Sequence, residues 1–337
     1  MDAADRARVI DLATRAPSIH NTQPWRFRWD GDVLDVYADR TRALPVLDPS
    51  ARQLHISCGG AVENARLAVR VAGRACLVEL LPTADPDHLA RLSVQGEEPA
   101  SPRERELAHA IPLRHTDRRP FDAREVPGAL LDRLRGEAEH DGVWVRVLQG
   151  EEETATIAVL SDAAERFEQQ DERYTEELAR WRRERGDAVD GIPLDALEGI
   201  SEQGVGSALH VRDFLPDRTA APSPAGSSPG TAADPDPDPP RVERPQVVLL
   251  ETREDTNAAW LRAGSALSQL LLACTVEHVS ASPLTQVLDV PSTREALRAE
   301  LGLIGRPQML LRLGYGSGGT GTPRRPVTDV LEPPASG

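Results

Sequence analysis

Hydrophobic and polar residues follow two different periods along the chain, and together they predict a mixture of helices and strands. Apolar residues recur at helical spacing over residues 4–16 and 52–73, where Pro17 and Gly73 mark the expected ends. Period-two alternation over residues 26–39, interrupted by an Asp-Gly turn, predicts a hairpin of two strands. The N-terminal third of the chain therefore combines both kinds of element.

The remaining elements are predicted in the same way. Further helices are expected over residues 86–95, 102–110, 127–140, 152–185, 257–280 and 292–302. A buried strand is expected over residues 75–81, and further strands over residues 143–149, 244–254 and 307–316. Residues 216–240 hold eight prolines among Ser, Ala, Asp and Gly without an apolar period, so this segment is not expected to contribute to a core.

Two of the predicted helices resemble each other. A shift of 205 positions sets the helix around Gly59 against the helix around Gly264. The identical pairs are Gly59/Gly264, Ala61/Ala266, Leu67/Leu272 and Ala68/Ala273, and Asn64 faces Gln269. Two Ala- and Leu-rich helices can match by composition alone, but each is also followed by a strand, which favours a duplication. We therefore expect two related halves in one chain, with an N-terminal half over residues 1–110 and a C-terminal half over residues 111–337.

Composition excludes several classes of function. The chain has 337 residues and a net charge of −15, which argues against binding to nucleic acids or anionic membranes. No apolar run is long enough to span a bilayer, and the N-terminus has no signal-peptide pattern, so a cytoplasmic protein is expected. The three cysteines and eight histidines show no metal-ligand spacing, and no metal site is predicted.

The chain contains no lysine. An anion site must therefore use arginine, backbone amides or hydroxyls, and Schiff-base chemistry is excluded. A P-loop is excluded for the same reason, and the Gly-rich run at residues 314–319 is not followed by a helix, as dinucleotide binding requires. No nucleophile–base pair is evident, so no catalytic residue is assigned.

The first candidate for ligand binding is the segment RAPSIHNTQPWRF, residues 15–27. It places several hydrogen-bonding side chains directly before Pro24 and Trp25. Such groups suit the orientation of a flat polar ligand. The alternative is a polar N-terminal loop that Trp25 fixes to the core.

The second candidate is RHTDRRPF, residues 114–121. Arg114, Thr116 and Arg118 alternate, so an extended segment would project them together, with Asp117 and Arg119 pointing the other way. Two guanidinium groups and a hydroxyl fit a phosphate monoester. The alternative is an exposed run of charges in salt bridges.

Two further segments lie near the C-terminus. PRRP, residues 323–326, offers Arg324 and Arg325 as a second source of phosphate contacts. ASPLTQ, residues 281–286, offers Pro283 and Leu284 as an apolar surface for a ring, and Thr285 and Gln286 as hydrogen-bonding groups.

These segments together resemble the flavin-dependent nitroreductase family, specifically its fused, two-halved Acg-type branch. The family pattern Ala-Pro-Ser-x-x-Asn-x-Gln-Pro-Trp matches residues 16–25, and Arg-x-Ser/Thr-x-Arg matches residues 114–118. The Gly-x-Ala-x-x-Asn/Gln-x-x-Leu-Ala helix occurs twice, and a Pro-hydrophobic pair precedes the last helix. The likeness covers most of the chain outside residues 186–245.

The resemblance implies an α+β nitroreductase-like fold in which two related halves mimic the family's homodimer, with no further subunit needed. The arginine motif occurs only once in this chain, so one FMN site, not two, is expected at the junction of the halves. Pro17, Ser18, His20 and Asn21 would contact the isoalloxazine, while Arg114, Thr116 and Arg118, with Arg324 or Arg325, would hold the phosphate. Pro283, Leu284, Thr285 and Gln286 would flank the ring.

The implied activity is electron transfer from NADPH or NADH through FMN to a small nitroaromatic, quinone or similar acceptor. Two features depart from the family. The lysine that the family often places near the flavin pyrimidine is absent, so either an arginine such as Arg173 replaces it or no residue does. An insertion at about residues 186–245 resembles a lid, and a lid that stays closed would favour a second function, the storage or sequestration of FMN without catalysis.

Overall fold

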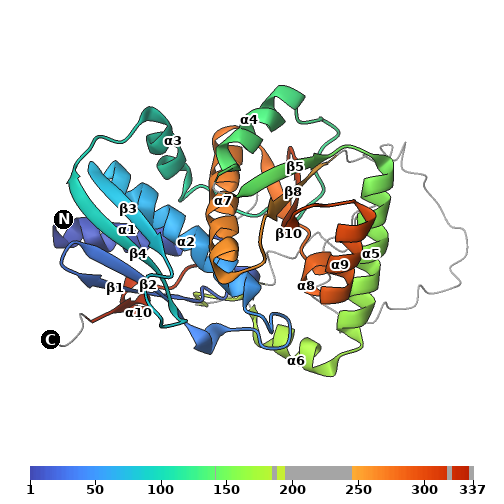
Figure 1. The fold of residues 1–337 in the computed structure, drawn as a ribbon, viewed down its shortest axis with the longest axis horizontal. Helices are drawn as coiled ribbons and strands as arrows, with labels where there is room; N and C mark the ends of the chain where they lie inside the picture. The colour runs from blue at the N-terminus through green and yellow to red at the C-terminus, as the bar shows by residue number, and fades with distance from the viewer. Residues whose placement is uncertain (141, 184–187, 194–244, 317–320, 334–337) are drawn as a thin grey trace, which may run out of the picture.

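Two β-sheets lie on either side of a central pair of long helices, α2 (Arg52–Val71) and α7 (Asn257–Val276), in a computed structural model of the chain (Figure 1). The structure describes residues 1–140, 142–183, 188–193, 245–316 and 321–333. The fold is of the predicted α+β class. Each of the two helices packs against one sheet and against the other helix, so most of their residues are buried.

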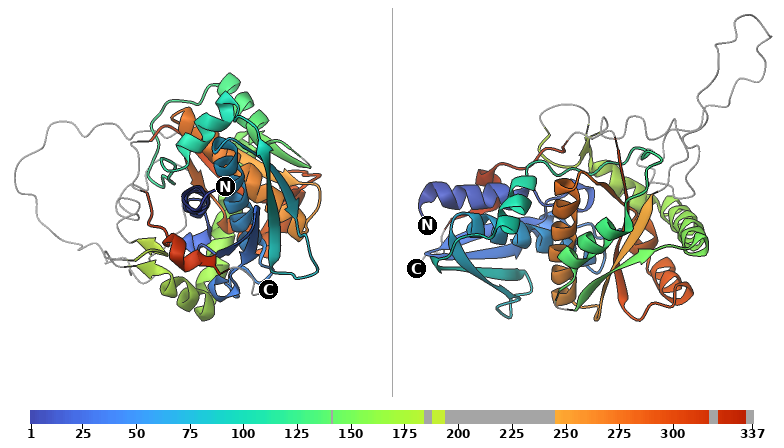
Figure 2. Two further views of the ribbon diagram at one scale, coloured as in Figure 1. Left: turned by 90° about the vertical axis from the view of Figure 1, so that its left-hand side faces the viewer. Right: turned by 90° about the horizontal axis from the view of Figure 1, so that it is seen from above.

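The first sheet contains the N-terminal strands and one strand from the C-terminus. Its order is β11-β1-β2-β4-β3, formed by β11 (Leu331–Glu332), β1 (Trp25–Asp30), β2 (Val33–Ala38), β4 (His88–Glu97) and β3 (Arg74–Leu80). The strands pair in antiparallel fashion, except that β11 is parallel to β1, with Phe27 opposite Leu331. Figure 2 shows this C-terminal segment returning to the N-terminal half.

Helices α1 (Ala3–Thr14), α2 and α3 (Pro102–Ala110) accompany the first sheet. A capping box begins α3: Ser101 accepts a hydrogen bond from the Glu104 amide, and Glu104 accepts one from the Ser101 amide. Trp25 and Phe27 of β1 are fully buried beneath these helices, as the alternating pattern of the strand requires.

The second sheet is antiparallel and has the order β5-β8-β10-β9. Its strands are β5 (Val143–Leu148), β8 (Gln246–Thr252), β10 (Arg306–Gly314) and β9 (Ser280–Pro283). The flanking helices are α4 (Gly128–Ala138) beside α7, and α5 (Glu151–Gln169), α8 (Gln286–Asp289) and α9 (Pro291–Glu300) on the other face (Figure 1). β10 is an inner strand, and all but its first residue are buried.

Short elements complete the described part of the chain. They are η1 (Ile19–Asn21), η2 (Arg40–Arg42), α6 (Glu172–Arg180), β6 (Arg182–Arg183), β7 (Ile192–Pro193) and α10 (Val327–Val330). β6 and β7 pair with each other in parallel. No helix among the described residues is long and apolar enough to cross a membrane.

The crossing of α2 and α7 has the contact pattern of a two-fold axis. A Cβ on Gly59 would meet the Leu261 carbonyl oxygen at 2.1 Å, and a Cβ on Gly264 would meet the Ile56 carbonyl oxygen at 1.9 Å. Ile56 and Leu261 are themselves related by the shift of 205 positions. Gly59 therefore packs on Leu261, and Gly264 packs on Ile56, the residue equivalent to Leu261. Such reciprocal contacts are those of an isologous interface.

Polar contacts across the same crossing repeat this symmetry. Gln269 donates a hydrogen bond to Glu63 at 3.0 Å, and Ser268 donates one to Asn64 at 2.7 Å. The shift of 205 positions relates Glu63 to Ser268 and Asn64 to Gln269, so the two hydrogen-bonded pairs are equivalent. Both helices have 20 residues and end in matching ways, with Gly73 at φ 79° and His278 at φ 55°. Two related halves share one body, while the boundary at residues 110 and 111 stays a prediction.

Two expectations about secondary structure were wrong. Residues 86–95 form strand β4 rather than a helix, because Ala90, Leu92 and Val94 alternate with polar residues and both neighbouring strands supply hydrogen bonds. β3 lies at the edge of its sheet instead of being buried, and Leu77 is 59% exposed.

The region 152–185 forms two helices, α5 and α6, because Asp171 caps a new helix start. Of the insertion expected at about residues 186–245, only residues 188–193 and 245 belong to the described part, and residues 216–240 lie outside it.

Candidate functional site

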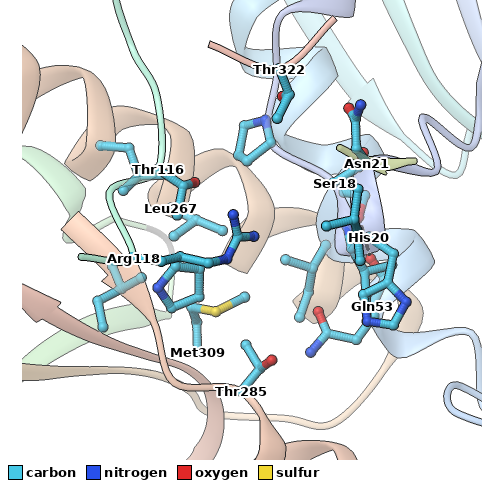
Figure 3. A pocket seen from close by; sticks show the side chains of 18 of the residues that line it. Ser18, His20, Asn21, Gln53, Thr116, Arg118, Leu267, Thr285, Met309 and Thr322 are labelled. Atoms are coloured by element: carbon cyan, nitrogen blue, oxygen red, sulfur yellow. Dashed lines mark hydrogen bonds between the residues drawn. The ribbon is translucent and has the colours of Figure 1, made fainter. Parts of the chain in front are cut away.

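A cavity lies where the two halves meet, and its wall is built from both of them (Figure 3). The first half contributes residues 17–21 and the start of α2. The second half contributes residues 114–118, one turn of α5, the middle of α7, residues 283–286, the inner strand β10 and residues near 322–324. Twelve of the thirteen residues predicted to bind the cofactor line this cavity; they are Pro17, Ser18, His20, Asn21, Arg114, Thr116, Arg118, Pro283, Leu284, Thr285, Gln286 and Arg324.

The first-half wall is a tight turn that the core holds in place. His20 and Asn21 have φ of 47° and 53°, a left-handed conformation that is uncommon outside glycine and asparagine. Ser18 accepts a hydrogen bond from the Gln23 amide at 3.0 Å, and the Ile19 amide donates to Ser57 of α2 at 3.2 Å. The turn is therefore fixed before any ligand binds, and it directs its polar side chains toward the cavity.

Asn21 connects three distant parts of the chain. Its side-chain amide donates to the Gly191 carbonyl and the Pro323 carbonyl, each at 3.1 Å, and its oxygen accepts from Arg324 at 3.1 Å. Because both ends of the side chain already have protein partners, Asn21 organises the cavity wall in addition to lining it.

Arg114 is buried in the wall, and no carboxylate in the described part of the chain pairs with it. Its side chain makes a long hydrogen bond of 3.4 Å to the Arg15 carbonyl, while Nε and Nη1 have no partner among the described residues. Burial alone lowers its pKa to about 10. A buried cation with open donors is costly, and it indicates a place for an anion.

Arg324 reinforces the same charge. It donates to Asn21, to Thr322 and to the Arg15 and Ala16 carbonyls, but no acidic residue in the described ranges pairs with it. Burial lowers its pKa to about 9, and the positive charges of Arg114 and Arg15 add to this effect. Two guanidinium groups, one buried and one half-buried, thus repel each other in one wall.

The segment around Arg118 alternates as predicted. Thr116 and Arg118 lie on one side of the cavity, opposite Ser18, His20 and Asn21 (Figure 3). Asp117 and Arg119 point elsewhere and form an ion pair with each other at 3.0 Å. The alternative of an exposed charge run therefore does not describe this segment.

Residues 283–286 form the apolar and amide-bearing part of the wall. Leu284 is buried, and its amide donates to the Leu310 carbonyl of β10 at 2.9 Å. Gln286 donates to the buried Glu168 of α5 at 3.1 Å, which fixes its side-chain amide.

Two arginines differ from expectation. Arg325 does not line the cavity; it contacts Asp39 at 3.5 Å and the Gln23 carbonyl at 3.3 Å, because adjacent side chains of an extended segment point to opposite sides. Arg173 pairs with Asp171 at the exposed start of α6, so it does not replace the missing lysine.

Several cavity residues were not predicted from the sequence. Gln53, Ile56 and Ser57 come from the first turns of α2, Leu267 and Leu271 from α7, and Met309 and Leu311 from β10. Gln53 donates to Asp289 at 2.7 Å, and the buried Arg52 holds the same carboxylate at 3.2 Å. Gln53 and Ser57 lie four positions apart, on one face of α2, and this spacing was the available signal.

The sequence resembles known proteins along almost its whole length, although no family model matches it. It is 34% identical over 345 residues to a protein of Mycobacterium tuberculosis that carries the provisional name NAD(P)H nitroreductase, covering 99% of this chain and 92% of the relative. The Acg protein of the same organism, also provisionally named an NAD(P)H nitroreductase, is 29% identical over 96% of this chain and 94% of its own length.

Solved structures show a more distant similarity. A nitroreductase of Desulfitobacterium hafniense with bound FMN gives a TM-score of 0.41 at 13% identity, covering 67% of this chain and 97% of that protein. The FMN-dependent nitroreductase NfnB of Mycobacterium smegmatis in complex with NADPH gives 0.36 at 19% identity, covering 63% and 88%.

Proposed function

The chain belongs to the NAD(P)H nitroreductase family, and we propose that it is an FMN-dependent oxidoreductase whose flavin site is the cavity between its two halves. NADPH or NADH donates the electrons, and a small nitroaromatic, quinone or similar acceptor receives them. FMN supplies the redox chemistry when it is bound, and the protein supplies binding, orientation and electrostatics. The halves already form the family's dimer-like body, so the protein is proposed to act as a monomer.

The single observation that carries this proposal is a pair of arginines, Arg114 buried and Arg324 half-buried, that have no acidic partner among the described residues. Arg114 and Arg324 line one cavity, both have a lowered pKa, and Arg114 has two open donor atoms among the described residues. A phosphate monoester carries two negative charges and accepts several hydrogen bonds, so it would compensate both guanidinium groups. The residues present therefore fit the phosphate of FMN.

The rest of the wall fits a flat ring with polar edges. Ile56, Leu267 and Leu271 provide apolar surface from the two central helices, and Pro283 and Leu284 provide more from the second half. Ser18, His20 and Thr285 place hydrogen-bonding groups around this surface (Figure 3). These residues are proposed to hold the isoalloxazine and to exclude water from it.

A second candidate function is storage of FMN without turnover. Its support is the segment of residues 190–193, part of which lines the cavity. The Gly191 amide donates to the Asn21 carbonyl at 3.2 Å, and Asp190 forms ion pairs with Arg42 and Arg183. A segment held in this way would restrict the approach of a nicotinamide.

Anaerobic reduction separates the two functions. The purified protein is expected to show a flavin spectrum, and addition of NADPH or NADH without oxygen is expected to bleach it. Bound flavin that resists both donors but is reduced by dithionite would favour storage. A protein that neither carries nor takes up FMN would refute both functions.

Arg118→Ala tests the assigned phosphate end. The change is expected to weaken FMN binding by about 1.5–3 kcal/mol, the scale of a hydrogen bond to a charged group. Titration of the apoprotein by flavin fluorescence measures this loss. Unchanged affinity would remove Arg118 from the proposed site.

A further inference from the structure

Residues 114–121 carry three cavity-lining side chains but belong to no helix or strand, so other contacts must fix them. The Asp117 amide donates to the Ala281 carbonyl of β9 at 3.2 Å. The Asp122 amide donates to the Tyr315 carbonyl at 2.8 Å, directly after β10. Phe121 packs on Gly314, where a Cβ would meet the ring at 2.4 Å. The segment is thus docked across the ends of β9 and β10.

Arg312 lies beneath this docked segment. It belongs to the inner strand β10, its exposed fraction is 2%, and it is not among the residues that line the cavity. Its Nη2 donates to the carbonyl oxygens of Arg118 and Arg119, both at 2.8 Å. Its guanidinium carbon also lies 4.5 Å from the centre of the Phe121 ring, within the range of a cation–π contact.

Two consecutive carbonyls that meet at one nitrogen reveal a turn. In an extended strand, successive peptide groups point to opposite sides, so their oxygens cannot share a donor. The chain therefore bends between Arg118 and Arg119, and Pro120 restricts the backbone of Arg119 in addition. Without Arg312, both carbonyls would lose this charged donor in a part-buried place, and the bend would relax.

We propose that Arg312 is a positioning residue for the phosphate end of the cavity. It acts through the backbone of residues 118 and 119, which sets the direction of the Arg118 side chain, and it does not touch the ligand. This inference rests on the proposed FMN site, but it concerns a residue behind the wall.

The test compares two ligands that differ only in the phosphate. Apoprotein carrying Arg312→Met is titrated with FMN and with riboflavin, beside the wild type, Arg312→Lys and the control Arg306→Met. Arg306 lies on the same strand but pairs with Glu295 at 3.1 Å away from the cavity. We expect the Kd of FMN to rise about 10- to 100-fold in Arg312→Met and the Kd of riboflavin to change less than about threefold.

The lysine variant supplies the rescue. An ammonium group donates to two carbonyls but stacks less well on a ring, so Arg312→Lys is expected to recover part of the preference for FMN. Arg306→Met is expected to keep all of it. An equal rise of both dissociation constants in Arg312→Met would reduce Arg312 to a general structural role and overturn the proposal, as would an unchanged preference.

Hydrogen exchange gives a readout that needs no ligand. The amides of Asp117 and Asp122 are expected to exchange at least about tenfold faster in ligand-free Arg312→Met than in the wild type, while the amides of α2 and α7 keep their rates. Unchanged exchange would contradict the positioning role. A wild type that fails to prefer FMN over riboflavin would instead contradict the proposed function, so the two failures are distinguishable.

Discussion

Replacing Arg114 by methionine is expected to stabilise the ligand-free protein and to weaken FMN binding at the same time. Arg114 is buried, and its pKa falls to about 10 because burial disfavours the charged form. At about 1.4 kcal/mol for each unit of pKa, this depression corresponds to roughly 3 kcal/mol. The ligand-free protein carries that penalty, and the phosphate is proposed to relieve it.

Methionine keeps an unbranched apolar stem but has no charge and no donor, so it removes the penalty and also the hydrogen bond to the Arg15 carbonyl, which is 3.4 Å long. Arg324 also donates to that carbonyl at 3.4 Å, so the loss of the Arg114 hydrogen bond costs only about 1 kcal/mol. The net gain in the free energy of unfolding is therefore expected to be about 1–2 kcal/mol. Loss of a charged phosphate contact is expected to cost about 2–3 kcal/mol of binding, or roughly 30- to 150-fold in Kd.

Urea unfolding of the apoprotein measures the first effect, and fluorescence titration with FMN measures the second. Arg133→Met is the matched control, because it changes the net charge equally. The Arg133 side chain is 63% exposed and pairs with Glu277 at the surface, so its loss is expected to change stability by less than about 1 kcal/mol and leave FMN binding intact.

If a phosphate compensates the charge of Arg114, the stability of the apoprotein must rise in Arg114→Met while its affinity for FMN falls. A destabilised apoprotein with normal FMN affinity would show that the body of the protein, and not a ligand, compensates the charge of Arg114. A loss of both stability and affinity would indicate that Arg114 mainly packs the wall.

Two further predictions concern the central helices. Gly264→Ala places a methyl group 1.9 Å from the Ile56 carbonyl oxygen, so it is expected to destabilise the protein by more than about 3 kcal/mol in urea unfolding. The control is Gly136→Ala in α4, where a Cβ meets nothing within 4 Å; it is expected to raise the free energy of unfolding by about 0.5–1 kcal/mol. Burial raises the pKa of Asp48, which caps the Leu54 amide, to about 6, above its value in the unfolded chain. Its contribution to stability is therefore full below about pH 4 and lost as the pH rises through 6. The free energy of unfolding of Asp48→Asn is expected to gain up to about 3 kcal/mol relative to the wild type between pH 4 and pH 7. A difference between the two proteins that stays constant with pH would contradict this.

Periodicity predicted the elements whose patterns are unambiguous. The hairpin β1–β2, the long helices α2 and α7, and the strands β8 and β10 lie where expected. It failed at residues 86–95, where Leu89 and Leu92 also satisfy a helical spacing. Pairing with two neighbouring strands decided that case, and a single segment does not carry this information.

Alternation also predicted which arginines turn toward the cavity. Arg114 and Arg118 line it, while Arg119 pairs with Asp117. The sequence left open whether Arg324 or Arg325 would contribute, and only the contacts of Asn21 and Asp39 distinguish them. Arg312 was not predicted, because the sequence of a buried strand does not show which loop packs against it.

The two copies in this chain have changed independently, and the central helices show how. The cavity residues Gln53 and Ser57 of α2 correspond, by the shift of 205, to Ala258 and Arg262 of α7. Arg66 of α2 stands at the position equivalent to Leu271, which lines the cavity.

Arg66 forms ion pairs with Glu63 at 2.8 Å and with Glu104 of α3 at 3.3 Å. A charged, paired side chain at that position removes the apolar surface that Leu271 offers to a ring. In a homodimer, one substitution alters both sites, because both subunits carry the same sequence. A duplicated chain does not have this constraint. Charges such as Arg66, Glu63 and Glu104 lie on one side of the axis, and Arg114, which pairs with no carboxylate among the described residues, lies on the other.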